Sequence, residues 1–310
     1  MLSLVIPVYR NAENLPRLLT ELEQLATRLP TDLEVVFVVD GSPDSSLQIL
    51  QERLPTWPIR SQLIELSRNV GSFAAIAAGL TSGKGEHFAV MAADMQEPPE
   101  LVLQFFELLR LGRADVTFGY RVGRPDPWWS RVLSDSFWRL YRRFVVKEMP
   151  RGGIDVFGCT RQVRDHLVGM KEVSTNLIAL LLWLGFTREF VPYERRPRLE
   201  GRSAWTFGRK MRYAMDSVFS FTDVPIRVLL FLGAAGTLAA VVASAVVLTF
   251  WLLGRVPVLG YTPLMLMITF FGGLTALGLG IVGQYLWISM QNARGRPAFV
   301  VKSTASFPRT

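Results

Sequence analysis

The sequence of 310 residues contains little of what metal centres and disulfide frameworks are built from: one cysteine and two histidines. Cys159 cannot form an internal disulfide, so the chain is not a disulfide-stabilised secreted domain, and a reducing compartment suits it. His87 and His166 have no partner at metal-ligand spacing, which disfavours a zinc site. The glycine patterns of the Walker loop and of the dinucleotide-binding turn are missing. The first residues lack the features of a signal peptide, so we expect none.

Charged residues are also scarce, at 19% of the chain, whereas half of the residues are apolar. The apolar excess lies in residues 228–253 and 263–288, and Arg255 in the link between them is the one charged side chain of residues 228–293. Each stretch exceeds the roughly 20 residues that cross a bilayer. Two buried helices of a soluble core are the alternative, but these stretches lack the polar face of such helices. We therefore predict a two-helix transmembrane hairpin within residues 226–290.

Basic residues flank this hairpin at both of its chain ends. Such residues mark the cytoplasmic side of membrane proteins. They are Arg209, Lys210, Arg212 and Arg227 before the first span, and Arg294, Arg296, Lys302 and Arg309 after the second. We therefore expect a multi-pass protein of the inner membrane, with a catalytic domain of residues 1–204, both termini and a tail of residues 291–310 in the cytoplasm.

The first 120 residues alternate short apolar runs with helical patterns. Strands are expected at residues 4–8, 33–39, 63–66, 88–91 and 116–119, and helices at residues 14–28, 45–54, 72–79 and 99–111. This alternation predicts an α/β domain with an open, mostly parallel sheet. Ligands of such sheets bind outside the carboxyl ends of the strands, so the residues that follow the strands are the first candidates for function.

Acidic and amide side chains follow two of these strands. Asp94 and Gln96 come after the fourth strand, and alternate positions of an extended chain point to the same side. Their oxygens suit a hard divalent cation that takes its other ligands from substrate phosphates. A solvated turn before the next helix is the alternative for this pair. Residues 40–44, Asp-Gly-Ser-Pro-Asp, likewise fit either a binding loop or an ordinary turn and helix cap.

Four segments together resemble the catalytic domain of glycosyltransferase family 2. They are residues 5–9 (Val-Ile-Pro-Val-Tyr), 39–44 (Val-Asp-Gly-Ser-Pro-Asp), 67–71 (Ser-Arg-Asn-Val-Gly) and 93–100 (Ala-Asp-Met-Gln-Glu-Pro-Pro-Glu). Within this family the chain is most similar to polyprenyl-phosphate glycosyltransferases: dolichyl-phosphate mannose synthases and bacterial undecaprenyl-phosphate sugar transferases with two C-terminal spans. The resemblance covers nearly the whole chain and implies a Rossmann-like fold of the GT-A type.

The resemblance also implies roles for matching positions. A UDP- or GDP-linked sugar would be held by Pro7, Tyr9, Glu13, Asp40, Ala93, Arg198 and Arg202. The metal, Mg²⁺ or Mn²⁺, would be held by Asp94 and Gln96, and the acceptor phosphate by Arg121, Arg131 and Ser134. Asp155 matches the proposed catalytic base and, with Asp94, completes the expected catalytic residues. The implied reaction transfers a sugar to polyprenyl phosphate with inversion at the cytoplasmic face.

The chain departs from the family pattern at several positions of this site, including Arg10-Asn11 in place of the usual Asn-Glu, for which Glu13 is a possible replacement. Val39 and Ala92 stand where the family has acidic residues, and Ala204 stands where it has a lysine. The lost carboxylates predict weaker metal binding. A catalytically impaired, membrane-anchored protein that binds nucleotide sugars or acts as a scaffold is therefore the alternative function. A processive polysaccharide synthase is disfavoured, because the chain has too few spans and no Gln-x-x-Arg-Trp element.

Two basic amphipathic stretches predict contact with membrane lipids. Residues 128–147 and 205–225 carry tryptophan and apolar side chains at helical spacing among arginines and lysines, which is typical of helices in the bilayer interface. Helices packed on the soluble core are the alternative. Glycines of the second span favour close helix contacts, and the resemblance implies a homo-oligomer, possibly a tetramer. Nucleic acid is not an expected partner.

Overall fold

A computed structural model describes residues 1–122, 139, 150, 154–170, 176–196, 218–219, 222, 224–253 and 261–309. Four predicted site residues, Arg131, Ser134, Arg198 and Arg202, lie outside the described residues. So do the predicted interfacial stretch 128–147, apart from Arg139, and most of the stretch 205–225. For Asp155, the structure describes the backbone but not the side chain.

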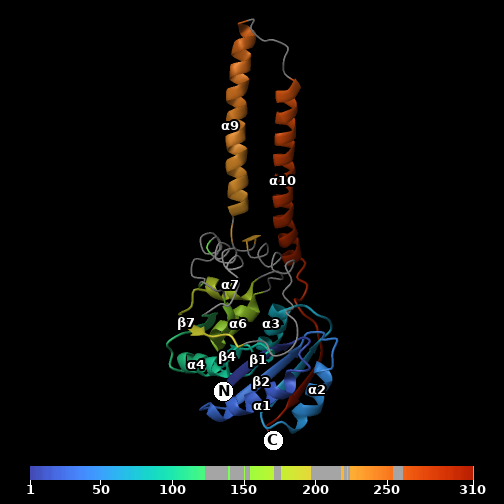
Figure 1. Cartoon of the computed structure of the whole chain (residues 1–310), viewed down its shortest axis with the longest axis vertical. Coiled ribbons are helices and arrows are strands. Elements are labelled where there is room, and N and C mark those ends of the chain that lie inside the picture. Colours follow the sequence, from blue (N-terminus) through green and yellow to red (C-terminus); the bar gives the residue numbers. More distant parts are fainter. Residues whose placement is uncertain are drawn as a thin grey trace.

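An eight-stranded mixed sheet forms the core of the domain (Figure 1). Its strands are β1 (Leu2–Val8), β2 (Leu33–Val39), β3 (Arg60–Leu66), β4 (His87–Val90), β5 (Val116–Arg121), β6 (Ile154–Thr160), β7 (Arg188–Tyr193) and β8 (Val301–Phe307). The strand order is β7-β5-β6-β4-β1-β2-β3-β8. All strands run in one direction except β6 and β8, which are antiparallel to their neighbours. The predicted α/β fold with a mostly parallel sheet is thus confirmed.

Helices cover both faces of this sheet. They are α1 (Leu15–Arg28), α2 (Ser46–Arg53), α3 (Ser72–Ser82), α4 (Pro99–Arg110), α6 (Arg161–Gly169) and α7 (Leu177–Trp183), with a short 3-10 helix at Leu54–Thr56. Alternate residues of β1 enter two separate apolar clusters, one with α1, α2 and α4 and the other with α3, α6 and α7. Because side chains of a strand point alternately to its two faces, the unbroken apolar run of β2 is buried on both sides.

The predicted elements of the first 120 residues are all present, with bounds within three residues of those expected. The helical pattern of α1 illustrates why. Leu15, Leu18, Leu19, Leu22 and Leu25 recur at helical spacing, and all five are buried against the sheet. Burial of each leucine side chain contributes roughly 1.5–3 kcal/mol, so this face fixes the helix on the sheet.

Two long apolar helices, α9 (Val224–Leu252) and α10 (Tyr261–Ala293), extend away from the sheet (Figure 1). Residues Val224–Ala243 and Phe270–Ala293 are long and apolar enough to cross a membrane, and 0% and 6% of these windows are buried. Such exposed apolar surface is unusual for a protein surrounded by water alone. By length and composition, α9 and α10 are two candidate membrane spans.

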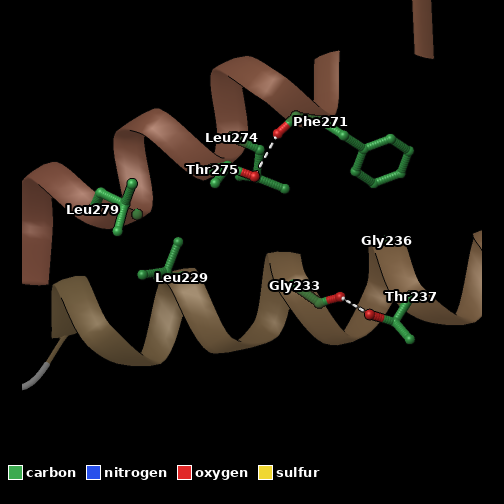
Figure 2. Close-up of a pocket in the computed structure, with 9 residues that line it drawn as sticks. Leu229, Gly233, Gly236, Thr237, Phe271, Leu274, Thr275 and Leu279 are labelled. Carbon is green, nitrogen blue, oxygen red and sulfur yellow. Dashed lines mark hydrogen bonds between the residues drawn. The ribbon is translucent and has the colours of Figure 1, made fainter. Parts of the chain in front are cut away.

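The two long helices approach each other at glycines. A Cβ atom on Gly236 would lie 3.1 Å from the Phe271 ring, and one on Gly278 would lie 3.2 Å from Leu229. Between these helices lies an apolar groove in which Thr237 and Thr275 each donate a hydrogen bond of 2.8 Å to their own helix backbone (Figure 2). These bonds satisfy the two hydroxyl groups within their own helices.

The chain returns to the sheet after α10, which the sequence did not predict. The expected tail 291–310 contains β8, which pairs antiparallel with β3. Lys302 Nζ lies 2.6 Å from Glu65 Oε1, and Ser67 N donates to Val300 O over 3.0 Å. A second contact lies beside the start of α9: Tyr285 Oη of α10 donates to Thr222 O, just before α9, over 2.8 Å. The Tyr285–Thr222 bond therefore links α10 to the chain before α9, and the chain after α10 is fastened to the sheet through β8.

Candidate active site

The predicted site residues that the structure describes gather at one edge of the sheet. Tyr9, Asp40 and Arg121 lie at or directly after the carboxyl ends of β1, β2 and β5, and Asp94 follows β4 by a few residues. Asp155 is the second residue of β6, whose antiparallel direction brings its first residues to this same edge. This edge is where open α/β sheets bind their ligands.

The loop after β1 is fastened to the loop after β2. Arg10 has a left-handed backbone (φ 56°), and its N–H donates to Ser42 Oγ over 2.8 Å. The Asp44 carboxylate accepts from Ala12 N, Ser42 Oγ and Ser46 Oγ. Burial raises the pKa of Asp44, but these hydrogen bonds outweigh burial and hold the pKa below its ordinary value. Asp44 thus fixes the relative position of the two loops.

Two further residues predicted to hold the nucleotide, Tyr9 and Glu13, belong to the first of these loops. Tyr9 is half-buried, and the Arg10 guanidinium lies over its ring at 5.4 Å. Glu13 is exposed just before α1, and Pro7 is half-buried within β1. These side chains are placed at the carboxyl edge of the sheet, where the resemblance predicts the nucleotide.

Asp40 is almost fully buried and binds the loop that follows β3. Its carboxylate accepts from Val70 N over 2.7 Å, from Gly71 N over 2.9 Å and from Asn69 Nδ2 over 3.1 Å. Burial raises the pKa of Asp40, and the two backbone hydrogen bonds oppose that effect. In this structure Asp40 positions residues 67–71, a motif to which the sequence assigned no role.

The loop after β4 is not extended, which corrects the reason given above for pairing Asp94 with Gln96. Residues 93–94 form a turn and Met95 has φ 56°, a backbone conformation that is rare for residues other than glycine. Asp94 Oδ1 accepts from Gln96 N over 3.4 Å. Glu97 is 4% exposed and accepts from Ala92 N over 3.3 Å, so this carboxylate closes the loop instead of facing solvent. Strain of this kind is typical of functional sites.

Two arginines that the sequence analysis did not single out contact this loop. Arg195 and Arg196 follow β7, whose carboxyl end lies at the same edge. The Arg195 guanidinium donates to Gln96 Oε1, and Arg196 N donates to Gln96 O over 2.9 Å. The Arg196 side chain reaches away to Glu21 and Glu100. The pairing spans about 100 residues of chain, so no local pattern could reveal it.

Asp155 stands at a β-bulge between β5 and β6. Gly119 pairs with Val156 and Tyr120 pairs with Ile154, so Asp155 is the extra residue. Bulges occur next to active sites because they redirect a side chain from the regular alternation of a strand. The backbone of Asp155 is therefore outside the regular strand pairing, at the same edge of the sheet where the neighbouring strand β5 ends with Arg121.

The model of the family described as Glycosyl transferase family 2 matches residues 3–168, which is more than half of the chain. The chain belongs to glycosyltransferase family 2. An uncharacterised glycosyltransferase of Synechocystis is 30% identical over 97% of this chain and 94% of its own. A prophage-derived bactoprenol glucosyl transferase of Shigella flexneri is 26% identical over 98% of each chain.

Among solved structures, the mannosyltransferase PcManGT of Pyrobaculum calidifontis, in complex with GDP-Man and Mn²⁺, is similar to this glycosyltransferase with a TM-score of 0.48. The two chains share 15% identity, and the similarity covers 92% of this chain and 87% of the other.

The donor set for a divalent cation is small in this family 2 glycosyltransferase. Asp94 is the one carboxylate of the two predicted ligands, and the oxygen of the other, Gln96, already accepts from the Arg195 guanidinium. Within the described part of the chain, no three His, Cys, Asp or Glu side chains gather into a metal-binding group. Hard cations take six or more oxygen ligands. Mg²⁺ usually keeps several waters and takes further oxygens from substrate phosphates, so a cation here would be held by Asp94 together with the phosphates of a bound substrate.

Proposed function

We propose that this protein transfers a sugar from a UDP- or GDP-linked donor to polyprenyl phosphate, with undecaprenyl phosphate as the bacterial form. The observation that carries the proposal is the connection of a family 2 sheet to two apolar helices, with the chain returning to the sheet as β8. The relatives named bactoprenol glucosyl transferase match 97–98% of the chain, the helices included, which supports a lipid acceptor.

In the proposed reaction, an oxygen of the acceptor phosphate attacks the anomeric carbon of the sugar. The bond from that carbon to the diphosphate oxygen breaks, and the electron pair leaves with the nucleoside diphosphate. A single displacement inverts the anomeric configuration. The second pKa of a phosphate monoester is around 6, so the acceptor is largely ionised at neutral pH and needs little help from a base. The main task of the protein is to stabilise the charge on the leaving diphosphate.

The residues of this chain divide between these tasks. Arg121, at the end of β5, is proposed to bind the acceptor phosphate together with Arg131 and Ser134. Asp155, at the bulge, is proposed to orient or deprotonate that phosphate. The first loops, with Tyr9 and Asp40, are proposed to hold the nucleotide. The dependence on Mg²⁺ or Mn²⁺ stays a prediction, and so does an oligomer, possibly a tetramer.

The proposed setting is the inner face of the cytoplasmic membrane. The helices α9 and α10 would cross the bilayer, and the residues 128–147 and 205–225 would lie in its interface. The acceptor chain would then stay in lipid while its phosphate reaches the edge of the sheet. The hydrogen bond between Tyr285 and Thr222 links α10 to the chain before α9, and the chain after α10 returns to the sheet as β8, which supports this arrangement.

The test is direct transfer. Full-length protein in lipid nanodiscs is mixed with undecaprenyl phosphate and a panel of UDP- and GDP-sugars, in Mg²⁺, in Mn²⁺ and in EDTA, and lipid products are detected by mass spectrometry. The expected product is a lipid-linked monosaccharide whose β-linkage, from an α-linked donor, is read by NMR. Donor binding without a lipid product from any donor would overturn the proposal in favour of a nucleotide-sugar-binding protein.

A further inference from the structure

We infer that Arg195 binds the donor diphosphate and supplies positive charge there, so that nucleotide binding does not depend on a divalent cation. The inference rests on the proposed nucleotide-sugar donor. It begins from a mismatch: the loop after β4 offers Asp94 and Gln96, and Gln96 Oε1 is engaged by a guanidinium. The positively charged Arg195 guanidinium thus already binds the Gln96 amide oxygen that was predicted to bind the metal.

The backbone holds the Arg195 segment firmly in this place. Arg196 N donates to Gln96 O over 2.9 Å, and Gln96 Nε2 donates back to Arg196 O over 3.4 Å. Gln96 itself is 7% exposed. The reciprocal bonds fix the chain after β7 against the chain after β4, so the backbone beside Arg195 is held at the carboxyl edge, and the exposed Arg195 side chain reaches Gln96 from there.

Arg195 and Arg196 differ in their acidic partners within the described part of the chain. Among the residues that the structure describes, the polar partner of Arg195 is the neutral Gln96 carbonyl, and no carboxylate pairs with it. Arg196, one residue on, is paired with both Glu21 and Glu100. The two neighbouring arginines therefore differ. Arg196 holds helices α1 and α4 to the loop, whereas the positive charge of Arg195 is available for a ligand.

The chemistry of arginine suits a diphosphate. A guanidinium presents five N–H donors in a planar fork and stays charged at any physiological pH, and it binds phosphate oxygens in pairs. One of its nitrogens donates to Gln96, which fixes the plane and leaves other N–H groups for a ligand. Lysine would keep the charge but lose this paired geometry.

The experiment measures binding of UDP and of GDP to the full-length protein by calorimetry, in EDTA and in Mn²⁺, without acceptor lipid. For the preferred nucleotide, we expect wild-type affinity in EDTA to be within about tenfold of that in Mn²⁺. Arg195→Gln should weaken binding in EDTA at least tenfold, and Arg195→Lys should weaken it less. Arg113→Gln, at the opposite edge of the sheet, makes the same change of net charge and should stay within twofold of wild type.

Two results would overturn the inference: wild-type affinity for both nucleotides that vanishes in EDTA, or an Arg195→Gln variant that binds in EDTA as tightly as wild type. A folded Arg195→Gln variant is verified by the protection of buried Cys159 from alkylation. The readout is separate from the transfer assay. If nucleotide binding depends on Arg195 but no lipid product forms, the proposed acceptor fails while this inference stands.

Discussion

Replacement of Gly41 by alanine tests whether the contact between the loops after β2 and β3 organises the site. Gly41 has φ +55°, and a Cβ atom there would lie 2.4 Å from Asn69 N and 2.5 Å from Arg68 C. Both are main-chain atoms, so the clash is relieved only by movement of residues 67–71. That loop carries the donors that bind the buried Asp40 carboxylate. The substitution should therefore separate Asp40 from its partners.

The expected cost has two parts. A left-handed backbone costs alanine roughly 1–2 kcal/mol relative to glycine. Loss of one hydrogen bond to the buried carboxylate of Asp40 adds about 2 kcal/mol, because bonds to charged groups contribute about 1.5–3 kcal/mol each. The total is about 3 kcal/mol. Gly112 is a matched control, since its φ is +65° and a Cβ there would meet nothing within 4 Å. Gly112→Ala should show the backbone part alone.

The single cysteine supplies the assay. Cys159 is fully buried in β6, and burial raises the pKa of its thiol to about 12, so alkylation requires opening of the sheet. Its labelling rate under native conditions measures that opening. Gly41→Ala should label about 30-fold faster than Gly112→Ala, which corresponds to about 2 kcal/mol, and should bind nucleotide more weakly. Equal labelling rates and unchanged nucleotide affinity in the two variants would refute the reasoning.

Three further predictions use other parts of the molecule. Ala92→Asp adds a carboxylate to the loop after β4 and should raise Mn²⁺ affinity at least tenfold, as read by electron paramagnetic resonance; unchanged affinity would mean that this loop does not take up a cation. Asp94→Asn should abolish transfer to lipid while Cys159 stays protected, and full activity of this variant would remove Asp94 from the site. Lys302 and Ser303 hold the pKa of Glu65 below its ordinary value of 4.5, so the stabilisation of β8 is present above that value and is lost as pH falls through the lower folded-state pKa. The protection factors of β8 amides, which compare measured with intrinsic exchange rates, should fall below about pH 4.5 in wild type, whereas Lys302→Ala should lower them at pH 7 by a factor that reflects less than about 1 kcal/mol.

The sequence by itself determined the features that local patterns encode. Buried faces repeat with the period of a helix or fill a whole strand, so β1 to β5 and α1 to α4 could be located from apolar residues alone. The predicted location of the site, at the carboxyl edge of the sheet, followed from the parallel order of those strands. The two apolar helices followed from length and lack of charge, and the family followed from four short motifs of the first 100 residues.

Only the tertiary structure decided which of these residues contact one another. β8 is polar and exposed along most of its length, so no alternation marks it as a strand, and its pairing with β3 joins residues more than 230 positions apart. Gln96, a predicted metal ligand, contacts Arg195, because a left-handed Met95 turns the loop and β7 ends nearby. Asp40 was predicted to hold the nucleotide, and the structure shows it binding the 67–71 loop. The spacing of apolar residues along the chain shows which side chains are buried. The partners of polar side chains depend instead on which strand ends, distant in sequence, lie side by side in the folded sheet.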